Sequence, residues 1–266
     1  MTDTLGDGLG IAYGGFTMNH TYQRFGMDAF WLKIVAMLLM VVDHVTSLLP
    51  LDYGEMGIYL HYPGRIVAPI FFFFLVEGFF FTRSRVKYLS RIMMWAAIMA
   101  AGSYLLSLIY PELRMLSNNI FLSLGLGVVL LIGLDWMKQG SMHRVIIGLL
   151  LAIAASAVSV MYTEASIYGV ICTLVFYFCR ERKWLLSIVY IATVLLITIG
   201  VGGDADLFNY EQLMINDPQW MMVFALPFLL LYNGNRGNNS TAAKYMFYVF
   251  YPLHLWLLYI ISYYLI

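Results

Sequence analysis

Four ionisable residues, Asp43, His44, Glu77 and His254, lie within long apolar stretches of this sequence. Placing an ionisable side chain at membrane depth costs at least ~2.5 kcal/mol on insertion scales, so such residues are candidates for functional sites. A histidine side chain, whose unperturbed pKa is about 6.5, can accept and release a proton at physiological pH. These residue types therefore point to proton-transfer chemistry within an apolar protein.

Asp43 and His44 are neighbours in the chain, and the side chains of neighbouring residues leave a helix about 100° apart. We therefore expect them to face adjacent parts of one cavity rather than each other. Arg65 follows a short loop and is the cation that we expect to hold Asp43 ionised. The alternative is a structural network of His and Asp that locks two helices together.

Glu77 and His254 allow more than one interpretation. Glu77 is expected either to serve as a further site residue, to pair with Arg83 or Arg91, or to reach toward the inner membrane interface. His254, within FYPLHLWLLY, is either a core histidine bonded to a backbone carbonyl or a second residue of the site.

The segment TRSRVKYLSR carries four basic residues, Arg83, Arg85, Lys87 and Arg91. Such a cluster is typical of the cytoplasmic side of a membrane protein. It also has the chemistry of an anion site, because Arg and Lys bind phosphate through charge-assisted hydrogen bonds.

The elements that carry these residues are apolar helices. Only 11% of the residues are charged and the mean hydropathy is +0.79, whereas soluble domains carry ~25% charged residues. Stretches such as LKIVAMLLMVV are continuously apolar and lack the alternation of a membrane β-strand. We predict an all-α polytopic protein, with a polar N-terminal segment at 1–29 and a single transmembrane domain at 30–266.

About nine spans are expected, at 30–49, 65–82, 88–109, 118–136, 144–161, 165–179, 184–201, 219–232 and 245–265. The second of these carries the run FFFFLVEGFFF, which we expect to form a lipid-facing and packing surface. The short spans 165–179 and 219–232 could be partly re-entrant.

The basic residues predict that the N terminus lies in the cytoplasm. With this orientation, all of the 15 Lys and Arg residues except Arg65 and Arg114 fall in cytoplasmic segments, as the positive-inside rule requires. We therefore expect a multi-pass protein of a bacterial cytoplasmic membrane. The net charge of zero implies no nucleic-acid partner.

Several of these segments also resemble a known family. LKIVAMLLMVVDHV, followed by PGRIVAPIFFFFLVEGFFFTRSRVKYLSR, is similar to the opening of the TraX family, whose best-known members are F-pilin acetylases. The later segments SNNIFLSLGLG, EASIYGV, LYNGNRG and YMFYVFYPLHLWLLY resemble the same family, in its order.

The resemblance implies a membrane acyltransferase, similar to other transmembrane acyltransferases, that takes acetyl-CoA from the cytoplasm. The acceptor would be an amine or hydroxyl, such as a pilin or peptide N terminus, a lipid or a surface glycan. Asp43 and His44 match the DH of the family and Arg65 its GR. Further polar positions of the family fall on Asn118, Asn119, Glu164, Tyr168 and His254.

The implied acyl transfer assigns an expected role to each of these residues. His44 is the favoured general base, and Arg65 or an asparagine is expected to stabilise the oxyanion. Asp43 is expected either to orient the imidazole of another group or to stabilise the cation that forms. The cluster from Arg83 to Arg91 would bind the phosphates of CoA, and no metal is expected.

The main alternative is a proton-coupled transporter or exporter with Asp43, His44 and Glu77 as its relay. A non-catalytic assembly factor is the third interpretation. Against a transporter stand the odd number of spans and the lack of a visible repeat.

Overall fold

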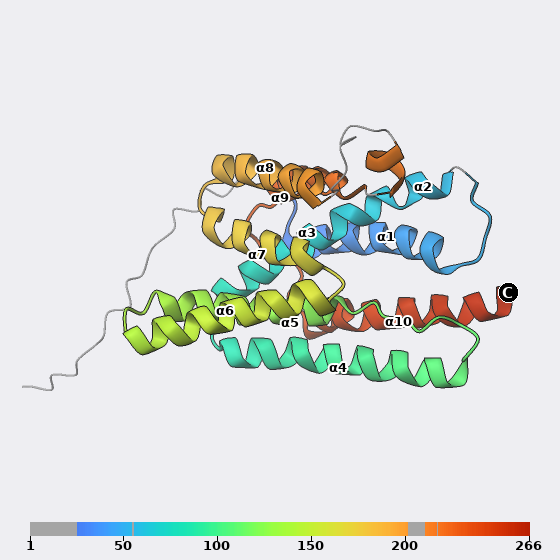
Figure 1. Ribbon diagram of the computed structural model, residues 1–266, viewed down its shortest axis with the longest axis horizontal. Helices are drawn as coiled ribbons and strands as arrows, with labels where there is room; N and C mark the ends of the chain where they lie inside the picture. Colours follow the sequence, from blue (N-terminus) through green and yellow to red (C-terminus); the bar gives the residue numbers. More distant parts are fainter. Residues whose placement is uncertain (1–25, 55, 202–210, 217) are drawn as a thin grey trace, which may run out of the picture.

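The computed structural model describes residues 26–54, 56–201, 211–216 and 218–266, so most of the expected polar N-terminal segment lies outside the described residues. Apart from one isolated bridge between Met27 and Tyr232, the regular structure in these ranges is helical. Most helices run along the long axis of the molecule, and α3 crosses between them at an angle (Figure 1). The elements are α1 (Ala29–Leu48), α2 (Met56–Leu60), α3 (Tyr62–Phe81), α4 (Arg85–Ile109), α5 (Ile120–Met137), α6 (Met142–Tyr162), α7 (Ser166–Cys179), α8 (Lys183–Val201), η1 (Gln212–Asn216), η2 (Pro218–Ala225), α9 (Leu226–Leu231) and α10 (Thr241–Leu265).

The all-helical, multi-pass prediction is confirmed for six segments that are long and apolar enough to cross a membrane: α1, α2 with α3, α4, α5, α6 and α10. The other three expected spans fall on shorter apolar helices, Ser166–Cys179, Lys183–Thr198 and Pro218–Leu231. A helix of 14 residues is only ~21 Å long, less than the ~30 Å of a hydrocarbon core. The count of nine crossings therefore stays a prediction.

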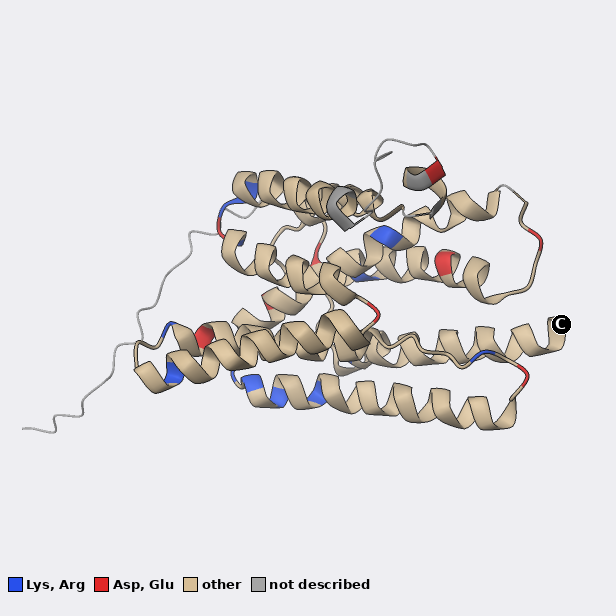
Figure 2. Cartoon of the chain, viewed as in Figure 1, with Lys and Arg blue, Asp and Glu red and all other residues tan. Residues whose placement is uncertain are grey.

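Charged residues separate along the long axis of the bundle. Figure 2 shows Lys and Arg gathered toward the end where α4 begins, α5 leads into α6 and α7 leads into α8. At the opposite end, the loops after α1 and α4 carry acidic residues. This distribution agrees with the expected alternation of the spans, while the orientation in a membrane remains a prediction.

Three contacts hold α1 in place. Its N-cap Asp28 accepts a hydrogen bond from the Trp31 backbone N–H at 3.0 Å, which satisfies one of the donors that a helix start leaves open. Ala29 N–H donates to the Asn235 carbonyl at 2.9 Å, which ties the start of α1 to the loop after α9. Farther along, α1 packs against α3, where a Cβ on Gly64 would overlap the Asp43 carboxyl group. The glycine of the GR pair thus allows α3 to approach Asp43.

The phenylalanine run of α3 divides into a packed part and an exposed part, in line with the packing and lipid-facing surface expected of it. Phe72, Phe73 and Phe74 are buried in the main core, as is Phe79, so this surface faces other helices rather than lipid. Phe80 and Phe81 are exposed, as a lipid-facing surface would be. Most of the run is buried because α1, α5, α7 and η2 all pack against α3, which makes it the central helix.

Candidate active site

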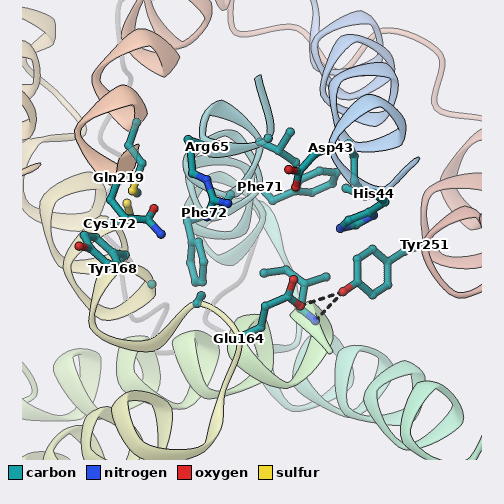
Figure 3. A pocket seen from close by; sticks show the side chains of 18 residues that line it. Asp43, His44, Arg65, Phe71, Phe72, Glu164, Tyr168, Cys172, Gln219 and Tyr251 are labelled. Carbon is teal, nitrogen blue, oxygen red and sulfur yellow. Dashed lines mark hydrogen bonds between the residues drawn. The ribbon is translucent and has the colours of Figure 1, made fainter. Parts of the chain in front are cut away.

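A polar cavity of about 140 Å³ lies among α1, α3, α7, η2 and α10. Its lining brings together Asp43, His44, Arg65, Glu164 and Tyr251 (Figure 3). Four of these were predicted as site or family positions from the sequence, and they meet although they come from three separate parts of the chain. Tyr168, another predicted position, lines the opposite wall.

His44 is buried and forms a pair with His254. The Nδ1 atom of His44 lies 2.8 Å from Nε2 of His254, whose own Nδ1 lies 2.8 Å from the Phe250 carbonyl oxygen. A carbonyl only accepts, so His254 Nδ1 carries a proton and His254 Nε2 is the acceptor. His44 must then donate from Nδ1, which leaves a lone pair on its Nε2. His254 therefore bonds a backbone carbonyl, as one of the two expectations had it, and also contacts His44, while its part in the site stays a prediction.

The partner of Asp43, which the sequence left open, is His61, whereas Arg65 was the cation expected to hold Asp43 ionised. His61 Nδ1 donates to Asp43 Oδ1 at 2.9 Å. His61 lies four residues before Arg65, at the N-cap of α3. Gly64 allows this end of α3 to approach Asp43. The expectation that Asp43 and His44 would not face each other agrees with their separate partners.

Arg65 lines the same cavity in a different way. Its buried Nε atom has no hydrogen-bond partner among the described residues. Leaving a buried donor unsatisfied costs ~1–3 kcal/mol, so an orphaned donor in a cavity calls for a functional explanation. A ligand oxygen that gains negative charge would satisfy it.

Glu164 anchors the far side of the cavity. It lies in the loop between α6 and α7, and its carboxylate accepts from Tyr251 Oη at 2.8 Å and from Asn118 Nδ2 at 3.1 Å. Tyr251 Oη in turn accepts from the Ile120 N–H. Burial raises the pKa of the Glu164 carboxyl group above its usual value, and the nearby Asp43 carboxylate adds to the increase. The hydrogen bonds from Asn118 and Tyr251 act in the opposite direction.

Asn119 has a structural position. Its side-chain oxygen accepts from the Leu122 N–H as the N-cap of α5, and its Nδ2 donates to the Ala96 carbonyl at 2.9 Å. It therefore joins α4 to α5 beside the Glu164 network.

Three residues near the cavity were missed from the sequence: His61, Gln219 and Tyr251. Tyr251 lies three residues before His254 and shares its helix face, a spacing within YPLHL that could have indicated it. His61 lies one helical turn before Arg65, and this spacing could have indicated it in the same way. Nothing in the sequence around Gln219 brings it to the cavity.

A second, larger cavity of about 560 Å³ is bordered by α1, α3, α4, α5, α10 and the loop before α10. Five cationic side chains line it: Lys33, Arg83, Arg91, Arg236 and Lys244. Its acidic residue among those described is Glu77, which accepts from Arg180 at 2.5 and 3.3 Å. The lining therefore carries an excess of positive charge.

The structure divides the predicted basic cluster. Arg83 and Arg91 line the second cavity, and Arg91 Nε donates to Tyr248 Oη at 3.1 Å. Arg85 forms an ion pair with Asp135, and Lys87 is exposed outside the cavity lining. Glu77 pairs with Arg180, so the partners expected for it, Arg83 and Arg91, were wrong.

One residue, Phe71 of α3, lines both cavities. The polar cavity and the basic cavity are therefore neighbours along α3. Among the described residues, no group of three or more His, Cys, Asp or Glu side chains is arranged to hold a metal ion.

Six long apolar helices indicate an integral membrane protein of the multi-pass class, and its polar cavity is bordered by α1, α3 and α10 together with the shorter α7 and η2. The chain belongs to the TraX protein family, whose family model matches residues 29–262. It is 30% identical over 240 residues to the probable fimbrial assembly protein FimC, serogroup H1, of Dichelobacter nodosus, covering 89% of this chain and 96% of that protein. No solved structure matches the chain.

Proposed function

We propose that this protein is an acetyl-CoA-dependent acetyltransferase of a bacterial cytoplasmic membrane. The observation that carries the proposal is the adjacency of a basic cavity and a cavity with a histidine pair, which share Phe71 as a wall. The first has the charge to bind a phosphorylated donor, and the second has the groups to transfer its acyl group. Membership of the TraX family supports the same activity.

The basic cavity is the proposed donor site. Acetyl-CoA supplies an acyl group activated as a thioester, and its phosphates require several cations. Those cations come from α1, the loop after α3, α4, the loop before α10, and α10: Lys33, Arg83, Arg91, Arg236 and Lys244. Arg side chains are suited to phosphate because they can donate two parallel hydrogen bonds. Phe71 marks the direction in which the acyl end would reach the polar cavity.

His44 is the proposed general base. Its Nε2 lone pair, left free by the bond from Nδ1 to His254, would take the proton from the attacking amine or hydroxyl. The acceptor atom bonds to the acyl carbon as the carbon–sulfur bond breaks. Arg65 Nε–H, which has no partner among the described residues, would donate to the carbonyl oxygen as it gains negative charge. The proton on His44 then passes to the sulfur that leaves.

The acceptor site is proposed to lie on the Asp43 and Glu164 side of the polar cavity. These carboxylates, with Tyr251, suit an acceptor that approaches as an ammonium group, loses one proton to a carboxylate before it attacks, and gives its next proton to His44 as it attacks. The relative FimC is named a probable fimbrial assembly protein. A pilus or fimbrial subunit N terminus is therefore the acceptor class that we favour over a lipid or a glycan.

The test uses purified protein in detergent. Acetyl-CoA should raise the melting temperature, since a ligand that binds only the folded state stabilises it, and a peptide with a free N terminus should gain an acetyl group by mass spectrometry. His44→Ala should abolish transfer and keep the acetyl-CoA-dependent stabilisation. Phe178→Ala, a change at an exposed residue outside both cavities, is the matched control. Absence of any stabilisation by acetyl-CoA or longer acyl-CoAs would contradict the proposal.

A further inference from the structure

We propose that Phe71 determines which acyl groups the protein transfers, by restricting passage from the basic cavity to the polar cavity to short chains. This inference rests on the proposed acetyltransferase function and adds a specificity-determining residue to it. Phe71 is not part of the hydrogen-bonded network around His44, so its proposed role is steric.

The position of Phe71 differs from that of its neighbours in the run Phe71–Phe74. Phe72, Phe73 and Phe74 are 1%, 9% and 8% exposed, and all belong to the main core. Phe71 is only partly buried because it borders empty space in both cavities. Phe71 is common to both linings, so a group that moves between the two cavities beside α3 would contact its ring.

The other aromatic wall of the polar cavity is fixed. Phe72 packs so closely on α7 that a Cβ on Gly169 would lie 2.6 Å from its Cζ atom. Phe72 therefore has no room to turn aside, since well-packed interiors tolerate few shifts. Phe71, with open space beside it, is the ring that can move and the ring whose size sets the passage.

The volume of the polar cavity sets a second limit. At about 140 Å³, it resembles the ~150 Å³ cavities that hold one benzene-sized molecule. It must accept the acyl group together with the reacting end of the acceptor. An acetyl group and a terminal amine fit this space, whereas a hexanoyl chain requires room that Phe71 occupies.

The experiment compares acetyl-, butyryl- and hexanoyl-CoA as donors to one acceptor peptide. Wild-type protein should transfer acetyl with the highest kcat/KM. Phe71→Ala should raise the ratio of hexanoyl to acetyl transfer at least about tenfold, the scale at which hydrophobic pockets discriminate chain length. Phe71→Trp should lower acetyl transfer while acetyl-CoA still raises the melting temperature. Phe178→Ala, at a phenylalanine outside both cavities, should keep the wild-type order of donors.

The outcomes separate this inference from the function beneath it. If wild-type protein transfers acetyl and Phe71→Ala keeps the wild-type ratio of donors, the role of Phe71 is refuted and the acetyltransferase proposal stands. If wild-type protein neither binds acetyl-CoA nor transfers acetyl, both fail. Should Phe71→Ala not fold, Phe71→Leu opens a smaller passage, and an unchanged hexanoyl-to-acetyl ratio there refutes the inference equally.

Discussion

His44 can serve as a base only if the ring nitrogen that meets the acceptor carries a lone pair. The chain from the Phe250 carbonyl through His254 to His44 specifies that state, because each link leaves one choice of donor. His254 is therefore proposed as a positioning residue. It acts through His44 and does not line the polar cavity.

Replacing His254 tests this arrangement. His254→Leu removes the acceptor for His44 Nδ1–H, so we expect kcat to fall at least ~10-fold, part of the ~10²–10⁴ that a positioned base contributes. His254→Gln retains an oxygen acceptor at similar reach and should recover much of kcat. Acetyl-CoA-dependent stabilisation should be the same in both variants. Equal activity of the Leu and Gln variants would show that His254 only fills space.

Gly64 provides a test of how Asp43 is placed. Gly64→Ala should push the Asp43 carboxylate away from His61, because an added Cβ overlaps it. We expect a loss of ~1–3 kcal/mol in unfolding free energy, as for overpacking in cores, together with a fall in kcat. Gly57→Ala is the matched control, since its closest neighbour is the Tyr53 Cβ at 3.2 Å. Normal activity of Gly64→Ala would separate Asp43 from the transfer step.

At the scale of residues, the sequence indicated which ionisable side chains lie within apolar helices but not which of them contact each other. Asp43 and His44 were predictable because charge and imidazole are rare in apolar helices. The His44–His254 contact joins residues 210 positions apart, and only the packing of α1 against α10 brings them together. The choice of His61 over Arg65 depended on where α3 begins.

At the scale of elements, one buried ion pair joins α3 to α7. Glu77 and Arg180 are 12% and 13% exposed, and Arg180 also lies over the Phe80 ring. Such a pair adds little net stability compared with apolar residues, but removal of one partner leaves an unpaired charge. The pair joins the two helices beside the basic cavity, whose lining includes Glu77.

We expect Glu77→Leu to lower the unfolding free energy by ~3–5 kcal/mol, because Arg180 is then buried without its partner. The double variant Glu77→Leu with Arg180→Leu should recover part of that loss. Melting temperatures in detergent, at one protein and detergent concentration, provide the measurement. A double variant less stable than Glu77→Leu would mean that Arg180 has another partner that matters more.

The basic cavity is also built by elements that are distant in sequence. Lys33 lies near the start of α1. Arg236 lies in the loop before α10, whose Asn235 carbonyl accepts a hydrogen bond from the first residue of α1. Lys33→Gln and Arg236→Gln should each weaken acetyl-CoA binding about tenfold, since a hydrogen bond to a charged group contributes ~1.5–3 kcal/mol. Lys87→Gln should bind normally. The Kd obtained by titrating acetyl-CoA against the melting temperature tests this. If only Lys87→Gln weakened binding, the donor phosphates would bind at the start of α4 instead of in the basic cavity.

The predicted helices came from continuous apolar runs, which explains why the six long spans were identified and why 165–179 and 219–232 stayed open as partly re-entrant. The residues that line the cavities were harder to predict from the sequence. Arg83 and Arg91 belonged to a visible cluster, but Lys33, Arg236 and Lys244 are isolated in the sequence and meet only after α1 and α10 pack. Local spacing also gave equal weight to Arg85, which the fold directs to Asp135.

At the scale of the whole molecule, the two cavities divide the proposed reaction between the two sides of a membrane. Basic residues that line the larger cavity belong to segments expected in the cytoplasm, where acetyl-CoA is available. The polar cavity includes Glu164, from a loop expected on the outer side. The charge distribution of Figure 2 follows the same axis. A donor from one side would then meet an acceptor from the other at Phe71 and His44.

This arrangement predicts a particular orientation, which single cysteines can test. The native Cys172 lines the polar cavity and Cys179 is buried, so both are replaced by alanine before the single cysteines are introduced. Asp52→Cys and Glu112→Cys, at exposed loop positions, should react from outside. Lys87→Cys and Arg144→Cys, also exposed, should react only after the cells are permeabilised. The opposite pattern would place the basic cavity outside, away from acetyl-CoA, and would contradict the donor site even if the helices and both cavities are as described.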